Sequence, residues 1–397
     1  MIFNTAWFLG FFLIFYALFW LMPGPKVRFF FVLAASAIFH AHFAGPAGVL
    51  PIVVMAVIVY AVGLRLDAAT EGHRLAWYRF GLLVPVAGLL YYKYRVLLIG
   101  SLIQGLPWLK ASLGVFAVPG PLPLAISFFT FEFVHYLTDV LHGKKPIRNP
   151  WAFGLFCIYF PSIVSGPIKR YEDFNAQVSD GIAAPQGWDD PARGFARVLL
   201  GFFKKMVIAD NVTTLIGLME ARQPWAAWHV WLLMGLLCIR ILFDFSGYSD
   251  IAIGLARMMG IRLPENFNWP YAAANIQDFW RRWHMSLSSW IRDYVYIPLG
   301  GSRQGGPRKV LNGLFAMALC GLWHGAAWNF VIWGVYHGCG LAIHGAWRTR
   351  FQPAQTRLAW AAAWTLNMVF VAYGWLLFFY PIDKVLFFTK ILFGAHA

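Results

Sequence analysis

Residues 310–341 read VLNGLFAMALCGLWHGAAWNFVIWGVYHGCGL, and this apolar run decides the class of fold. A membrane-spanning helix needs about 20 predominantly apolar residues, so the run can supply two helices, which we expect over 309–323 and 326–346. Glycine permits a turn or a close approach of two segments, and Gly325 therefore marks the expected break. The strongly polar side chains of the run are Asn312, His324, Asn329 and His337.

Comparable apolar stretches recur from one end of the chain to the other. Of its 397 residues, 60% are hydrophobic and 12% are charged, whereas a soluble domain carries about 25% charged residues. This composition predicts an all-α polytopic membrane protein with about ten to twelve membrane-embedded helices. Because no repeat, low-complexity tract or long linker divides the sequence, we expect a single membrane domain over residues 1–397.

The individual helices are expected where the apolar stretches lie. Besides the two helices above, they cover residues 1–22, 27–64, 77–92, 95–117, 124–142, 151–164, 193–219, 226–243, 357–379 and 383–394. A break is expected near Gly45-Pro46. The first stretch lacks a basic segment before it and a small-residue cleavage site after it, so we expect a retained span and not a signal peptide. The acidic stretch 171–192 predicts an extramembrane loop.

The charge of the chain is strongly positive, with a formal net value of +15. In a soluble protein such a charge would indicate a nucleic-acid partner. Here the basic side chains fall in short connections between apolar runs, which is typical of cytoplasmic loops, so no nucleic-acid partner is expected. The side chains concerned are Lys26, Arg28, Arg65, Arg74, Arg79, Lys144, Lys145, Arg148, Lys169, Arg170, Arg303, Arg308, Lys309, Arg348 and Arg350.

Residues 275–294, NIQDFWRRWHMSLSSWIRDY, are amphipathic. If they form one helix, their polar and apolar side chains separate onto different faces, and Asn275 can cap its start. The side chains of the expected polar face are Gln277, Arg281, His284 and Ser288. The pattern indicates a helix at the membrane interface or a short helix tucked into a bundle.

His324 is expected to lie within the thickness of the membrane. If a helix starts beside Arg308 and Lys309, the 14 residues 310–323 rise ~21 Å, which is less than the hydrocarbon thickness of about 30 Å. An ionisable side chain at that depth indicates function; the alternative is a buried histidine bonded to a neighbouring carbonyl. A desolvated imidazole stays neutral and can accept the proton of an alcohol. Such a base suits a reaction whose substrates come from opposite sides of the membrane.

Two other clusters offer alternative chemistry. Cys320 falls on the same helical face as His324 and could form a Cys–His acyl-enzyme pair, although a small apolar role is the simpler interpretation. In FEFVHYLTDVLH, residues 131–142, Glu132 and His135 have the Glu-x-x-His spacing of di-iron sites. No second motif of this kind is present, so we expect a buried polar network or a channel lining and no metal site.

The stretch from Phe243 to Arg303, which includes SGYSDIAIG, WRRWH and YIPLGG, resembles the membrane-bound O-acyltransferase family. The same holds for GLWHGAAWNFVIWGVYHG, residues 321–338, and for ISFFTFEFVHYLTDVLHG, residues 126–143. The similarity covers about residues 120–345 and is greatest to the bacterial branch that acylates cell-envelope polymers. That branch contains alginate O-acetyltransferase membrane subunits and the D-alanyl transfer proteins of teichoic acid modification.

The resemblance implies a fold in which many helices surround a central funnel or tunnel, with short tilted helices inside. It implies that His324 is the catalytic base toward the acceptor hydroxyl, and that His284 orients it or polarises the thioester carbonyl. The other expected site residues are Trp280, Trp283, Trp323 and Asn329 along the tunnel, and Arg281 and Arg282 at a donor phosphate. A tunnel would also exclude water, which would otherwise hydrolyse the thioester.

By the same resemblance, the substrates are a cytoplasmic thioester, acetyl-CoA or a phosphopantetheinyl carrier protein, and a cell-envelope polysaccharide. No bound cofactor is expected. The implied location is the bacterial inner membrane, crossed many times, and a periplasmic acyltransferase partner is left open. SGYSDIAIG and YIPLGG favour acetyl transfer, whereas the end of the chain soon after Phe379 favours D-alanyl transfer; acetyl is ranked first.

Two alternatives from other functional classes stay open on the sequence. A transporter or proton relay would also place ionisable residues inside the membrane, but the related halves typical of transporters are not visible. A structural partner in polymer export would need no catalytic histidine.

Overall fold

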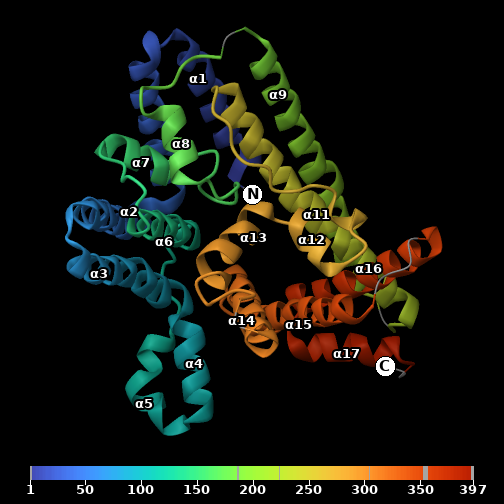
Figure 1. The fold of residues 1–397 in the computed structure, drawn as a ribbon. Helices are drawn as coiled ribbons and strands as arrows, with labels where there is room; N and C mark the ends of the chain where they lie inside the picture. Colours follow the sequence, from blue (N-terminus) through green and yellow to red (C-terminus); the bar gives the residue numbers. More distant parts are fainter. Residues whose placement is uncertain (1, 186, 223, 304, 352–355, 395–397) are drawn as a thin grey trace. The chain divides into compact units, whose positions relative to one another are not determined.

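The computed structural model describes residues 2–185, 187–222, 224–303, 305–351 and 356–394 (Figure 1). Within these ranges the chain is helical, with short 3₁₀ and π turns and no β-strand. The chain divides into two compact units. Unit 1 comprises Met1–Leu199 with Asp250–Pro264, and unit 2 comprises Leu200–Ser249 with Glu265–Ala397. The expected all-α class is confirmed, whereas the single domain stays a prediction.

Unit 1 contains the N-terminal helices. They are η1 (Ile2–Asn4), α1 (Ala6–Leu21), α2 (Gly24–Ala68), α3 (Glu71–Leu89), η2 (Leu90–Tyr94), α4 (Arg95–Gly105), η3 (Pro107–Leu109), α5 (Lys110–Leu113), η4 (Gly114–Ala117), α6 (Ile126–Leu141), α7 (Pro150–Ile158), α8 (Tyr171–Val178) and most of α9 (Asp189–Phe202). Helices α2, α3 and α6 lie side by side (Figure 1).

Helix α2 is bent where the sequence predicted a break. Gly45 has a φ of 64° inside the helix, and Pro46 follows it directly. Glycine adopts a positive φ at little steric cost, and a proline inside a helix lacks the N–H and clashes with the preceding turn. The two residues together therefore explain the bend, and the prediction is confirmed.

The acidic stretch 171–192 is not a continuous loop, and in this respect the prediction was wrong. It contains α8, in which Tyr171, Phe174 and Val178 are buried. Their spacing places them on one face of a helix, and burial of that face stabilises a helix whose other face is polar. The extramembrane location of the stretch stays a prediction.

Unit 2 contains the remaining elements. They are η5 (Phe203–Ala209), α10 (Asp210–Glu220), α11 (Ala227–Met258, whose last residues belong to unit 1), η6 (Pro270–Ala272), α12 (Ile276–Arg282), α13 (Met285–Ile291), η7 (Arg292–Tyr296), α14 (Gly306–His324), α15 (Trp328–Arg350), α16 (Arg357–Phe379) and α17 (Ile382–Leu392). The break predicted at Gly325 is confirmed, since α14 ends at His324. Helix α11 continues beyond its expected end because its polar residues Ser249 and Asp250 are buried within the fold.

Four helical stretches are long and apolar enough to cross a membrane, and α1 is a shorter apolar helix. The four are Gly24–Ala68, Glu71–Gly105, Ala227–Met258 and Arg357–Phe379. Large apolar side chains on these stretches and on α1 are exposed, such as Leu13 at 71% and Leu366 at 74%, as expected for contact with lipid. The chain is therefore a polytopic membrane protein. The total number of embedded helices and the central tunnel stay predictions.

The predicted helix over 275–294 is wrong as a single helix. It consists of α12 and α13, which are separated at His284, where φ is 43°. The backbone N–H of Asn268 donates to the Arg282 carbonyl at 3.0 Å, and that of Met285 donates to the Asn266 carbonyl at 2.9 Å. These bonds to a distant segment replace the helical hydrogen bonds. The polar face expected for one continuous helix does not form, although Asn275 caps α12 as predicted.

Candidate active site

The turn between α14 and α15 depends on close contacts that only glycine permits. A Cβ added at Gly325 would overlap the ring of Phe330, and one added at Gly321 would overlap the Phe330 carbonyl oxygen. Gly325 itself is extended, with a φ of −163°, so the close approach and not its backbone conformation requires glycine. Small residues let membrane helices pack closely. This packing holds His324 at the last turn of α14.

The half-buried His324 ring is enclosed by aromatic side chains. Its centroid lies 4.8 Å from that of Trp323, 5.3 Å from that of Trp333 and 5.1 Å from that of Phe378, all in edge-to-face arrangements. Aromatic rings exclude water and offer no counter-charge. The enclosure therefore keeps bulk water away from the imidazole, as suits a base that must act on an alcohol and not on water.

The second predicted histidine is fully buried. His284 lies between two seven-residue helices, outside the candidate spans, and is 0% exposed. Its left-handed conformation costs about 1–3 kcal/mol in a residue other than glycine, and such strain is common at functional sites. Burial lowers the pKa of the His284 imidazole well below its usual range, and the nearby His324 lowers it further. His284 is therefore neutral at neutral pH.

Three of the predicted site residues come together in unit 2. The ring centroids of His284 and His324 are 6.4 Å apart. Trp323 contacts both rings, at centroid distances of 5.8 Å and 4.8 Å. Two imidazoles at this separation in an apolar enclosure can hold and pass a proton, if a substrate or a small adjustment brings their nitrogens into hydrogen-bond reach.

Two other predicted tunnel residues belong to a neighbouring aromatic layer. Trp280 contacts Trp333 at a centroid distance of 5.8 Å, and Trp283 contacts Trp375 at 4.9 Å. Both predicted tryptophans are buried, at 8% and 2% exposure. They therefore support the rings around His324, and a direct role in lining a tunnel stays a prediction.

The polar members of the predicted site make contacts of their own. Arg281 is exposed, and Arg282 forms an ion pair with Asp278 at 2.9 Å. The side-chain amide of Asn329 donates to two carbonyl groups in the last turn of α16, each at 3.3 Å. Asn329 therefore helps to hold α16 against α15. Contacts of these three residues with substrate stay predictions.

Four residues close to the histidines were missed by the sequence analysis. They are Phe245, Asn266, Trp333 and Phe378. The aromatic ones look like ordinary helix-core residues in the sequence. Asn266 had one signal, since it is a polar residue in the aromatic ENFNWPY segment inside the stretch that carries the family resemblance.

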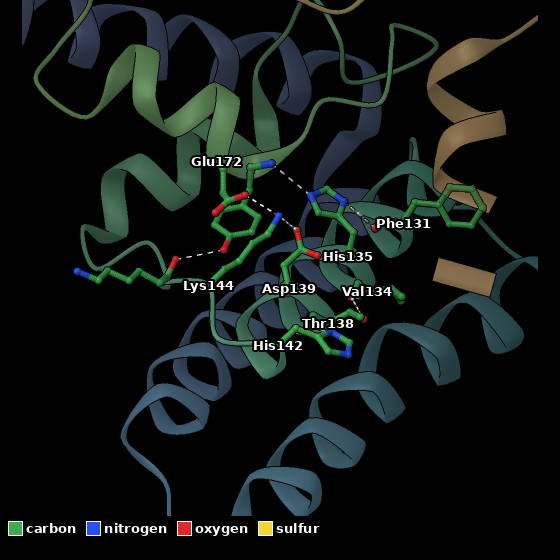
Figure 2. Close-up of polar contacts among 10 residues, drawn as sticks. Phe131, Val134, His135, Thr138, Asp139, His142, Lys144 and Glu172 are labelled. Carbon is green, nitrogen blue, oxygen red and sulfur yellow. Dashed lines mark hydrogen bonds and ion pairs between the residues drawn. The ribbon is translucent and has the colours of Figure 1, made fainter. Parts of the chain in front are cut away.

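The polar cluster of α6 is separate from the histidine pair and lies in unit 1 (Figure 2). Nδ1 of His135 donates to the Phe131 carbonyl at 3.2 Å, and its Nε2 accepts the backbone N–H of Tyr171 at 3.3 Å. Lys144 pairs with Asp139 at 3.0 Å and with Glu172 at 2.5 Å. Because both nitrogens of His135 are engaged by the backbone, the expectation of a buried polar network is confirmed. No cluster of three metal-ligating side chains occurs within the described ranges.

Glu132 and Lys169 form a deeply buried ion pair in unit 1. Their side chains are 7% and 2% exposed, and the Nζ–Oε1 distance is 2.5 Å. Nζ also lies 4.9 Å from the ring centroid of Phe156, which adds a cation–π contact. Lys169 lies in the connection between α7 and α8, as the sequence predicted, but its charge is buried against a carboxylate. Its cytoplasmic location stays a prediction.

Removal of one partner of this pair is expected to destabilise unit 1 strongly. Glu132→Gln leaves the Lys169 ammonium buried without a counter-charge, which costs about 3–5 kcal/mol. The measurement is thermal unfolding of the purified protein in detergent. The double variant Glu132→Gln/Lys169→Met is expected to recover most of the loss, because it removes the unpaired charge. Equal melting temperatures for the single variant and the parent protein would contradict this assignment.

The fold and the site define a polytopic α-helical membrane protein with two histidines side by side in an aromatic enclosure. A family model described as the membrane-bound O-acyltransferase family matches residues 75–382. This chain belongs to that family, and it is an O-acyltransferase. Membership favours an enzyme over the transporter that the sequence left open.

Three relatives show the branches of the family to which the chain is similar. It is 39% identical over 390 residues to a probable alginate O-acetylase of Azotobacter vinelandii, covering 95% of this chain and 75% of that protein. It is 31% identical over 382 residues to a peptidoglycan O-acetyltransferase of Helicobacter pylori, covering 89% and 71%. It is 32% identical over 274 residues to a teichoic acid D-alanyltransferase of Bacillus subtilis, covering 64% and 68%.

Proposed function

We propose that the protein moves an acetyl group from a cytoplasmic thioester to hydroxyl groups of a cell-envelope polysaccharide, across the bacterial inner membrane. The observation that carries the chemistry is the pairing of His324 with His284, 6.4 Å apart, inside the aromatic enclosure. The acetyl group is favoured because two of the three relatives above, including the one with the highest identity, are named as acetyl-transferring proteins.

In the proposed reaction, His324 is the general base. Its imidazole takes the proton of the acceptor hydroxyl while the hydroxyl oxygen attacks the carbonyl carbon of the thioester. The carbon–sulfur bond then breaks, and the His324 imidazolium returns its proton to the leaving thiolate. The products are an acetyl ester and a free thiol, with His324 neutral again. The surrounding rings keep water from competing with the acceptor.

A D-alanyl group carried by a phosphopantetheinyl protein is the second candidate. It is supported by the 32% identity to a teichoic acid D-alanyltransferase. That similarity covers 64% of this chain, against 95% for the alginate O-acetylase relative, so acetyl transfer stays first.

The two donors can be distinguished directly with membranes that contain the protein. Labelled acetyl-CoA, an acetylated carrier protein and a D-alanylated carrier protein are supplied separately, and label in alkali-labile ester linkage to envelope polymer is measured. Acetyl label that depends on His324 is the expected result. D-alanyl label alone would overturn the acetyl assignment. Transfer that appears only after a periplasmic acyltransferase is added would show that the polymer is acylated through a partner.

A further inference from the structure

We propose that Asn266 is a positioning residue for acyl transfer, because it holds His284 in the tautomer with the proton on Nδ1. The inference rests on the proposed function, in which His284 acts beside His324. It goes further, since it assigns His284 the role of a hydrogen-bond acceptor and identifies the residue that enforces this role.

The orientation of the Asn266 amide follows from its neighbours. Its Oδ1 accepts the backbone N–H of Ser286 at 3.2 Å and the Ser286 hydroxyl at 2.8 Å, and its Nδ2 donates to the Ser249 hydroxyl at 3.2 Å. A backbone N–H can only donate, so the atom beside Ser286 is the amide oxygen. That same oxygen lies 3.1 Å from Nδ1 of His284. Nδ1 must therefore carry the proton.

The consequence concerns the other nitrogen of the ring. Nε2 of His284 is buried and has no hydrogen-bond partner within the described ranges. In a neutral imidazole with the proton on Nδ1, Nε2 is an acceptor, so it cannot donate to a thioester carbonyl. Of the two roles that the sequence left open for His284, orientation of the neighbouring base fits and polarisation of the carbonyl does not.

The natural donor to Nε2 is an N–H group of His324. The centroid distance of 6.4 Å is slightly too long for a direct bond in this conformation, and such contacts commonly tighten when substrate binds. The bond would leave the second nitrogen of His324 basic toward the acceptor hydroxyl. When His324 takes the hydroxyl proton, the bond would stabilise the imidazolium until the thiolate receives that proton. No proton need leave His324 toward His284.

Few charges act on the His284 ring. His324, on α14, is the titratable group whose charge lowers the pKa of His284. On α11, which supplies the adjoining Phe245 ring, Asp244 is half-exposed and paired with Lys205 at 2.7 Å. Glu265, the neighbour of Asn266 in the chain, is exposed. A charge placed at position 266 would therefore dominate the titration of His284.

The first test is kinetic and uses the full-length protein in membranes. Asn266→Leu keeps the approximate size of the side chain but removes the acceptor, and we expect kcat to fall about 10- to 100-fold, as for other residues that orient a catalytic group. The KM for the thioester donor is expected to stay within about twofold of the parent value. Ser249→Ala is the matched control, because it removes the bond to Nδ2 and leaves the bond to His284. It is expected to lower kcat less than Asn266→Leu does, because Ser286 still holds the amide oxygen in place. Unchanged kcat in Asn266→Leu would overturn the inference.

The second test does not depend on the survival of that variant. Asn266→Asp keeps an oxygen beside Nδ1 and adds a negative charge, which stabilises the imidazolium of His284 and raises its pKa. A protonated His284 cannot accept a hydrogen bond, so activity is lost as pH falls through this pKa. The acid limb of the pH–rate profile is therefore expected to move to higher pH by about one unit or more. A profile identical to that of the parent protein would contradict the inference.

The inference and the proposed function can fail separately. If His324→Ala and His284→Ala both retain full transfer, the histidine mechanism is wrong. If both lose transfer while Asn266→Leu and Asn266→Asp behave like the parent protein, the mechanism stands and only the role of Asn266 is wrong.

Discussion

Replacement of His324 by alanine is expected to lower acyl transfer by about 100- to 10,000-fold, the usual contribution of a general base. The side chain sits at the end of α14, among Trp323, Trp333 and Phe378, and its ring centroid lies 6.4 Å from that of His284. Because His324 is half-buried at a helix end, the variant is expected to accumulate in the membrane. The measurement is transfer of labelled acetyl groups, normalised to the amount of protein.

Two variants serve as matched controls for this prediction. His344→Ala removes a half-buried histidine from α15, outside the enclosure, and is expected to leave transfer unchanged. Cys320→Ala removes the thiol that the sequence left open as a covalent nucleophile, and it too is expected to retain transfer. Full activity of His324→Ala would end the general-base mechanism, and loss of activity in Cys320→Ala alone would favour an acyl-cysteine intermediate.

Substitution of Gly321 by alanine is expected to disrupt the packing of α14 against α15. The new methyl group would overlap the Phe330 carbonyl oxygen, and it would also lie 3.1 Å from the Gly334 nitrogen. Backbone atoms cannot move aside as a flexible side chain can, so the helices must separate, at a cost of about 3 kcal/mol. His324 lies one turn further along α14, so transfer is expected to fall together with the melting temperature in detergent.

The same two helices contain ideal controls. An added Cβ at Gly313 on α14, or at Gly345 on α15, would meet no atom within 4 Å. Gly313→Ala and Gly345→Ala are expected to keep full activity and to gain up to about 1 kcal/mol of stability, because alanine favours the helix more than glycine does. If all three variants melt alike, the close approach at Gly321 does not occur in the protein.

The members of the candidate site differ in how far the sequence revealed them. His324 stood out because a histidine in an apolar run is costly and needs a reason. His284 was found through the WRRWH motif, but its expected place on the polar face of a long helix was wrong. Asn266 was missed because asparagine is common in irregular segments. Its proposed role depends on its hydrogen bond to Nδ1 of His284, a residue 18 positions away, and the sequence does not show this bond.

The sequence by itself determined the membrane class, most helix ranges and the breaks at Gly45 and Gly325, because apolar runs and glycine or proline breaks act locally along the chain. Only the tertiary structure decided where His284 lies. Hydrogen bonds from residues 266–268 divide the 275–294 segment at that histidine, and the glycines of α14 and α15 allow the contact that holds His324. Such contacts join residues far apart in the chain, so their strength depends on packing that no local pattern encodes.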